Sequence, residues 1–194
     1  MNEKYIVSKQ IKILAISFML IGLVGIVYGF VSAPSNIKEA KEIGRMVAVD
    51  PSRTTPPTWY KGATLLKPNK VESLMMAQSL GCTEKDIEKV AMLLVDKLAL
   101  KKIIITLGSE GMGMIDTETD GKFHRIPTVA KEVFDVSGAG DTAISAVVSA
   151  LVSSATLEEA AWVGNCASGV VVGKKGTALA SQEELKAFYP SLIK

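Results

Sequence analysis

The sequence is poor in the residues from which most metal centres and covalent catalytic sites are built. Its 194 residues include one histidine and two cysteines. His124 lies in a predicted strand, where a packing or surface role explains it better than catalysis, and Cys82 and Cys166 lack metal-ligand spacing. We therefore expect neither a zinc site nor a histidine-based catalytic triad. The two cysteines also form no disulfide framework, which favours a reduced, cytoplasmic protein.

An excess of charge of one sign is also missing. Lys and Arg number 22 against 20 for Asp and Glu, so the net charge is +2. This balance predicts no nucleic-acid partner. Internal repeats and low-complexity linkers are absent, and a hydrophobic content of 48% suits one well-packed domain at this length.

Residues 13–33 carry no charge at all, and three explanations fit them. The run is long enough to span a bilayer as a helix. It also resembles a secretory signal with small residues at Val31–Ala33, although Pro34 is a poor context for cleavage. The third explanation is a buried strand at Gly22–Gly29, because strands of parallel sheets read as continuous apolar runs.

From residue 34 onward, short apolar strands alternate with helical patterns. Strands are predicted at 46–49, 63–66, 102–107, 112–116 and 122–126. Apolar residues from Ile87 to Leu98 predict a helix capped by Thr83, and Thr156 with Glu159 forms the capping box of a helix to about Val172. This alternation predicts an α/β protein with a mostly parallel sheet.

The most informative stretch is Asp135–Thr142, with the sequence Asp-Val-Ser-Gly-Ala-Gly-Asp-Thr. Gly138 to Gly140 let the backbone turn tightly and approach a ligand, and a helix starting here would point its first N–H groups at an anion. Asp141 would stand at the mouth of that site, able to take a proton or hold a metal. An ordinary loop with an acid at a helix N-terminus explains the same residues.

Other polar residues and glycines follow the predicted strands. Asn69 and Glu72 come after one strand, and Thr106, Gly108 and Gly111 close another. Each alone is explained by a cap, a first-turn acid or a turn. Ligands of parallel α/β sheets bind outside the carboxyl ends of the strands. The occurrence of polar residues and glycines at several strand ends together therefore favours a ligand site.

Together these motifs resemble the PfkB, or ribokinase-like, family of sugar kinases. The matching segments are Asp135–Asp141, an Asn-x-x-Glu motif at Asn69–Glu72, a Thr-x-Gly-x-x-Gly turn at Thr106–Gly111, and Asn165. The resemblance runs from about Tyr28 to Lys194. Residues 62–69, 132–137 and 169–177 are most similar to the kinase of bacterial ADP-heptose synthesis, which phosphorylates the anomeric hydroxyl of a heptose 7-phosphate.

The resemblance implies a ribokinase-like three-layer α/β/α sandwich over residues 34–194, truncated at the N-terminus and preceded by the apolar segment 1–33. Family members carry an N-terminal half with the sugar-contacting residues, and no counterpart is found here. A membrane span with Lys4, Lys9 and Lys12 inside would place the ATP site outside the cell, as would a signal peptide. A strand near Val24–Tyr28, or a non-native join, is therefore preferred over a membrane anchor.

The resemblance also implies roles for individual residues. Asp141 would be the base that takes the proton of the sugar hydroxyl, and the amides of Gly138, Ala139 and Gly140 would stabilise the transferring phosphoryl group. The remaining implied roles are Mg²⁺ binding through water by Asn69 and Glu72, nucleotide contacts by Thr106, Gly108, Gly111 and Asn165, and a monovalent cation such as K⁺ at Asp135, Ser137 and Gly176.

The expected function is thus an ATP- and Mg²⁺-dependent phosphotransferase acting on a sugar or sugar-phosphate hydroxyl, similar to a heptose 7-phosphate kinase. The alternative is a catalytically incomplete nucleotide-binding remnant that lacks the sugar-binding half. A membrane-anchored interaction module is a third hypothesis, motivated by residues 13–33 alone. Expected partners are ATP, a phosphosugar, and either a second copy of the chain or a separate N-terminal half.

Overall fold

The computed structural model describes residues 34–130, 132–176 and 178–188. The explanations offered for residues 13–33 therefore lie outside the described part of the chain. The helices are α1 (Pro34–Glu42), α2 (Lys70–Ser79), α3 (Ile87–Leu98), α4 (Ala139–Val152), α5 (Leu157–Val172) and α6 (Gln182–Phe188). The strands are β1 (Ala48–Val49), β2 (Leu65–Leu66), β3 (Lys102–Thr106), β4 (Met112–Asp116) and β5 (Phe123–Ile126).

The five strands form one sheet in the order β1-β2-β3-β4-β5. β1, β2 and β3 are parallel neighbours, with Val49 beside Leu66 and Leu66 beside Ile103. β4 and β5 continue the sheet as antiparallel neighbours. The short turns that join β3 to β4 and β4 to β5 explain this change, because a parallel connection needs a crossover of a dozen or more residues.

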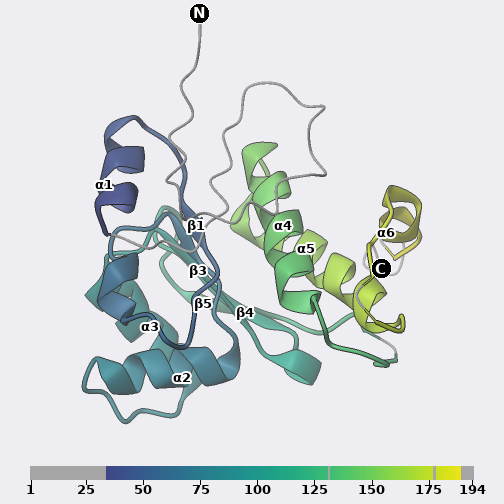
Figure 1. The fold of residues 1–194 in the computed structure, drawn as a ribbon, viewed down its shortest axis with the longest axis horizontal. Helices are drawn as coiled ribbons and strands as arrows, with labels where there is room; N and C mark the ends of the chain where they lie inside the picture. Colours follow the sequence, from purple (N-terminus) through teal and green to yellow (C-terminus); the bar gives the residue numbers. More distant parts are fainter. Residues whose placement is uncertain (1–33, 131, 177, 189–194) are drawn as a thin grey trace, which may run out of the picture.

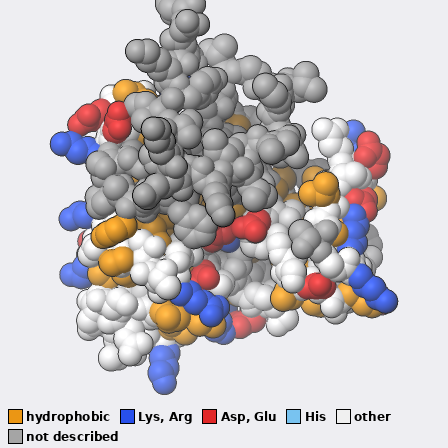
Figure 2. All heavy atoms as spheres, viewed as in Figure 1, with side chains coloured by type: hydrophobic (Ala, Val, Ile, Leu, Met, Phe, Trp, Pro, Cys, Tyr) orange, Lys and Arg blue, Asp and Glu red, His pale blue; other side chains and the backbone are white. Residues whose placement is uncertain are grey.

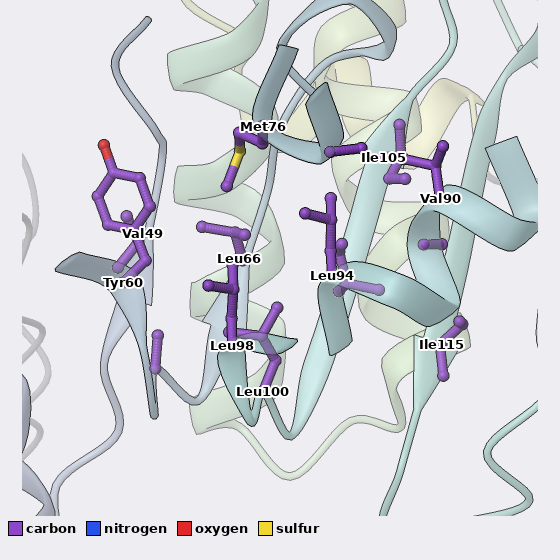
Figure 3. Close-up of a cluster of buried hydrophobic side chains, with 14 of the residues drawn as sticks. Val49, Tyr60, Leu66, Met76, Val90, Leu94, Leu98, Leu100, Ile105 and Ile115 are labelled. Atoms are coloured by element: carbon purple, nitrogen blue, oxygen red, sulfur yellow. The ribbon is translucent and has the colours of Figure 1, made fainter. Parts of the chain in front are cut away.

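Helices cover both faces of the sheet, so the predicted three-layer α/β/α arrangement is confirmed (Figure 1). α1, α2 and α3 lie on one face, and α4 and α5 lie on the other. Successive side chains of β3 point to opposite faces of the sheet, so the strand contributes to a hydrophobic core on each face. Ile103 and Ile105 belong to the core beneath α1, α2 and α3, which is the first core, and Ile104 belongs to the second core, beneath α4 and α5. Figure 3 shows the first core, where Leu94 and Leu98 of α3 face the sheet.

Small residues let α4 and α5 pack closely on the second face. A Cβ atom placed on Gly164 of α5 would lie 2.6 Å from Val147 Cγ2 and 3.0 Å from the carbonyl oxygen of Ala143, both on α4. Only glycine fits this crossing without movement of its neighbours. The close contact fixes the position of α4, whose first turn carries the Gly-Ala-Gly-Asp motif.

The capping predictions had mixed outcomes. The capping box of Thr156 and Glu159 is confirmed at the start of α5. The prediction that Thr83 caps the preceding helix is wrong, because α3 begins at Ile87 and the side chain of Asp86 accepts the Glu88 amide at 2.9 Å. The carboxylate of Glu84 accepts the amides of residues 85 and 86, which holds residues 84–86 in a turn before the helix.

Within residues 34–130, 132–176 and 178–188, no helix is both long enough and apolar enough to cross a membrane.

Candidate functional site

The predicted turn and helix at the Gly-Ala-Gly motif are confirmed. Gly138 is the N-cap of α4 and adopts φ 77°, a left-handed conformation that favours glycine. The first helical bond of α4 joins the Thr142 amide to the Gly138 carbonyl at 2.9 Å. Asp141 lies in this first turn with its side chain exposed, which places a carboxylate at the positive end of the helix dipole.

An ion pair with a buried lysine lies against the same turn. Lys67 Nζ is 3.0 Å from Asp50 Oδ2, and the Lys67 side chain is 3% exposed. A Cβ atom placed on Gly140 would lie 3.7 Å from that nitrogen and 3.9 Å from that oxygen. The pair therefore packs directly beside the backbone of the Gly-Ala-Gly motif.

Three carboxylates influence one another at these strand ends. Burial raises the pKa of the Asp50 carboxyl; the neighbouring Lys67 lowers it, and the negative charges of Glu72 and Asp141 raise it further. Asp50 follows β1, Glu72 lies in α2 and Asp141 lies in α4. The charges of Glu72 and Asp141, from distant parts of the sequence, thus reach Asp50, which is paired with the buried Lys67. Figure 2 shows acidic and basic side chains next to one another near the middle of the face that it displays.

Asn69 and Glu72 form a complete capping box at the start of α2. Asn69 Oδ1 accepts the Glu72 amide at 2.9 Å, and Glu72 Oε2 accepts the Asn69 amide at 2.9 Å. The second carboxylate oxygen, Glu72 Oε1, lies 3.9 Å from Nε of Arg53, an exposed residue of the loop after β1. The capping explanation is therefore realised, and it uses one of the two Glu72 oxygens.

The donor set at Glu72 is compatible with Mg²⁺ and not with a metal held entirely by protein side chains. Over the ranges that the structure describes, no three His, Cys, Asp or Glu residues are grouped so that they could hold a metal ion. Mg²⁺ retains several waters and is commonly bound by one or two carboxylates together with substrate phosphates. Glu72 and its neighbour Asp50 could supply such carboxylates.

The predicted nucleotide turn lies beside the start of α2. Asn69 and Thr106 pair as an isolated parallel bridge, and the Thr106 amide donates to the Pro68 carbonyl at 3.0 Å. Gly111 closes the turn with φ 87°, and a Cβ atom there would lie 2.0 Å from the Ile126 carbonyl oxygen. Gly108 also has a positive φ, but the space around it is open.

A charged contact links the same two segments on the surface. Lys70 Nζ lies 2.6 Å from Glu110 Oε1, and Glu110 Oε2 lies 3.7 Å from Arg125 on β5. Lys70 follows Asn69 directly, and Glu110 precedes Gly111. The two segments that sequence motifs assigned to metal and nucleotide binding are thus held together in the fold.

The side chain of Asn165 makes a structural hydrogen bond within the fold. It is buried in α5, and its Nδ2 donates to the Pro127 carbonyl oxygen at 2.6 Å. This bond anchors the segment that follows β5. The nucleotide contact of Asn165 stays a prediction, since the structure accounts for the side-chain amide as an anchor.

The three residues predicted to bind a monovalent cation do come together. Asp135 Oδ1 accepts the Ser137 amide at 2.8 Å. Hydrogen bonds from the backbone and hydroxyl of Ser137, and from the backbone of Gly176, lower the pKa of Asp135. The amide of Phe134 donates to the Val172 carbonyl at 2.7 Å, which ties this segment to the end of α5.

Sequence reasoning missed Asp50, Lys67 and Arg53. A usable signal existed for the first two, because each directly follows a predicted strand of the parallel sheet. Residues that directly follow parallel strands lie together at the carboxyl-end edge of the sheet, as Asn69 and Thr106 do. Arg53 lies in a polar loop and carried no pattern.

Comparison with known proteins shows which proteins the chain is similar to. Residues 34–184 match the family described as pfkB family carbohydrate kinase. The chain is 40% identical over 149 residues to the bifunctional protein HldE of Paramagnetospirillum magneticum, and 44% identical over 135 residues to that of a Nitratiruptor species. These alignments cover 77% and 70% of this chain but only 30% and 28% of the two relatives.

Solved structures share the fold. The ribokinase of Thermotoga maritima superposes with a TM-score of 0.71 at 24% identity, over 80% of this chain and 52% of that enzyme. Phosphofructokinase-2 of Escherichia coli, in complex with potassium, superposes with a TM-score of 0.72 at 24% identity, over 83% of this chain and 52% of that one. The ribokinase-like fold is therefore confirmed, and the chain spans about half the length of these enzymes.

Proposed function

The chain belongs to the pfkB family of carbohydrate kinases, and on that premise we propose that it carries the phosphoryl-transfer machinery of an ATP-dependent sugar kinase. The single observation that supports this most is the arrangement at the α4 N-terminus. Asp141 lies in the first turn of the helix, directly after the Gly-Ala-Gly backbone, and the buried cation of Lys67 lies beneath that backbone.

Asp141 is the proposed base. Its exposed carboxylate can accept the proton of an attacking sugar hydroxyl as that oxygen bonds to the γ-phosphorus. The backbone of Gly138, Ala139 and Gly140 would face the transferring phosphoryl group, where N–H donors fixed in advance stabilise developing charge. Phosphoryl transfer depends on such positioning and charge more than on covalent chemistry by the protein.

Asn69 and Glu72 are the residues that would hold Mg²⁺, through its waters. When bound, the ion would supply positive charge that offsets the negative charge of the nucleotide phosphates. The capping box fixes both side chains, so Glu72 Oε1 keeps a defined direction. Thr106, Gly108, Gly111 and Asn165 would border the nucleotide.

A monovalent cation such as K⁺ is proposed at Asp135, Ser137 and Gly176. The carboxylate of Asp135 has a lowered pKa and stays ionised, which suits a cation beside it. A phosphofructokinase-2 with this fold was solved in complex with potassium. The position just before the α4 turn would let such a cation influence the anion site.

The proposed acceptor is a sugar phosphate, with heptose 7-phosphate as the first candidate. The relatives that support this are bifunctional HldE proteins, of which the chain matches about 30%. A cytoplasmic location follows from the need for ATP. A second copy of the chain, or a separate N-terminal half, is the proposed protein partner.

A nucleotide-binding protein without turnover is the second candidate. It is favoured by the extent of the match, since the chain covers 52% of the ribokinase and phosphofructokinase-2 structures. In this case ATP and Mg²⁺ would bind, but no hydroxyl would be presented to Asp141.

One set of measurements separates the two candidates. The full chain is incubated with ATP, Mg²⁺ and a panel of sugar phosphates that includes heptose 7-phosphate, alone and mixed with the N-terminal half of a related kinase. Turnover that disappears in Asp141→Asn supports the kinase, while ATP binding by calorimetry without turnover supports the second candidate. Absence of both binding and turnover would contradict both.

A further inference from the structure

β1 lies at one end of the described sheet, yet it has the character of an interior strand. Ala48 packs into the second core and Val49 into the first, so both faces of the strand are buried. Residues 46–49 carry no charge. Interior strands of parallel sheets are apolar on both faces, whereas edge strands are commonly protected by charged residues. β5, at the other end of the described sheet, has His124 and Arg125 exposed.

The backbone of β1 can bond to a further strand on its outer side. The carbonyls of Val47 and Val49 accept the amides of Leu65 and Lys67 at 3.0 Å and 2.9 Å. Because successive residues of a strand direct their N–H and C=O groups to alternate sides, those of Ala48 point away from β2. Ala48 is buried, and buried backbone groups need hydrogen-bond partners. Among residues 34–130, 132–176 and 178–188, no strand pairs with this side of β1.

The hand of the connections fixes where a strand before α1 would lie. β2 is joined to β3 through α2 and α3, and β3 lies on the side of β2 away from β1. α1 covers the same face as α2 and α3, through Ile37 and Ala40, and leads into β1. Connections between parallel strands are right-handed in about 98% of cases, so helices on one face step across the sheet in one direction. A parallel strand before α1 would therefore lie on the outer side of β1.

We propose that residues 22–29 are this sixth strand, that they pair in parallel with the outer side of β1, and that α1 is the crossover helix. Residues 13–33 carry no charge and end where α1 begins, at Pro34. A strand buried on both faces requires such an apolar run. The direct link to α1 keeps these residues at a high effective concentration near β1, which favours them over a second copy of the chain or another protein.

This pairing has two consequences for the chain. The free edge of the sheet moves outward by one strand, so a second copy or a separate N-terminal half would meet residues 22–29 and not β1. The carboxyl end of the new strand would lie beside that of β1, which Asp50 follows. The residues after the strand would then border the candidate site. The pairing itself does not depend on the proposed kinase function.

Backbone NMR of the full chain tests the pairing directly. We expect nuclear Overhauser contacts between the backbone protons of Ala48 and those of residues 22–29, and slow exchange of the Ala48 amide with solvent. Ile26→Pro removes a backbone donor from the middle of the strand and should speed exchange at Ala48 about tenfold or more. The Leu66 amide in β2 should stay protected. Ser8→Pro is the matched control, because Ser8 precedes the uncharged run, and it should leave Ala48 unchanged.

Three results would overturn the inference. The first is a wild-type chain without contacts between Ala48 and residues 22–29, a result that needs no variant to fold. The second is protection of Ala48 that appears only as the chain dimerises at higher concentration, which would assign the outer side of β1 to a second copy. The third is flotation of the wild-type chain with vesicles of phosphatidylethanolamine and phosphatidylglycerol, which would assign the run to a membrane. None of these measurements involves turnover, so a failure of the proposed function is separate from a failure of this inference.

Discussion

The backbones of Asn69 and Thr106 pair in a parallel bridge just beyond β2 and at the end of β3. This pairing sets the start of α2 against the turn that leads into β4. The Lys70–Glu110 ion pair joins the same two segments at 2.6 Å on the surface. A change in the capping box of α2 should therefore reach the proposed nucleotide turn as well as the helix.

The first prediction concerns that capping box. Asn69→Ala should lower the free energy of unfolding by about 1 kcal/mol, because the Glu72 amide loses its acceptor, Asn69 Oδ1, while the Glu72 carboxylate keeps its bond from the backbone amide of residue 69. Urea unfolding measures the change. The same variant should weaken the Mg²⁺ dependence of nucleotide binding, measured by calorimetry.

Thr156→Ala is the matched control for Asn69→Ala. Thr156 forms the same kind of capping box with Glu159 at the start of α5. Its loss should cost a similar amount of stability, about 1 kcal/mol, and leave Mg²⁺-dependent nucleotide binding unchanged. If both variants weaken nucleotide binding equally, the effect at Asn69 is one of stability alone.

The second prediction compares two glycines of the proposed nucleotide turn. Gly111→Ala should disrupt the turn, because its Cβ would lie 2.0 Å from a backbone oxygen of Ile126 that cannot easily move. Gly108→Ala should cost only about 1 kcal/mol of left-handed strain, since the space around it is open. Thermal unfolding of both variants tests this order, and an equal loss would contradict it.

The local features of the site could be predicted from the sequence. The Gly-Ala-Gly turn, the start of α4 and the Asn69–Glu72 cap depend on residues close together in the chain. Side chains at those positions have strong preferences of their own, such as glycine for the left-handed conformation that Gly138 adopts. The ends of the strands could also be predicted, because short apolar runs are broken there by polar residues or glycine.

Each of Asp50 and Lys67 directly follows a predicted strand, but their pairing with one another could not be predicted from the sequence. It depends on the register of β1 and β2, in which Val49 lies beside Leu66, so that Asp50 and Lys67 occupy the next positions on each strand. Both strands are only two residues long, and no local pattern fixes their register. The predicted cap of α3 was wrong for a related reason. Thr83 and Asp86 are both residue types that cap helices well, and the hydrogen bonds of Glu84 decide between them.

The third prediction concerns the α4–α5 crossing. Gly164→Ala should lower the free energy of unfolding by about 1–3 kcal/mol, because the added methyl group meets Val147 and the Ala143 carbonyl. This loss should exceed the gain of about 1 kcal/mol that alanine brings within a helix. Chemical unfolding measures the net change.

A compensating substitution checks the cause. Val147→Ala removes the Cγ2 atom that lies 2.6 Å from the new methyl group. In the Gly164→Ala background, Val147→Ala should cost less than it does in the wild-type chain, because it relieves the overlap. Additive losses would mean that the overlap with Val147 is not the reason for the destabilisation.

The fourth prediction concerns the acid stability of the charged cluster at the start of β3. Hydrogen bonds from Lys101 and Lys102 lower the pKa of Glu118 to about 2 from its ordinary 4.5. A carboxyl whose pKa is lower in the folded state stabilises the fold above its unfolded pKa, and this contribution fades as the pH falls through the folded value. Glu118 is nearly half exposed, so screening by water limits the contribution to less than about 1 kcal/mol.

Glu118→Gln should therefore be less stable than the wild type at pH 7, and the difference should shrink as the pH falls from 4.5 towards about 2. Urea unfolding at a series of pH values measures it. Glu158→Gln is the control, because Glu158 is exposed in the first turn of α5, away from Lys101 and Lys102. A deficit of Glu118→Gln that stays constant across this pH range would mean that packing, and not the charge of the carboxylate, is what the lysines stabilise.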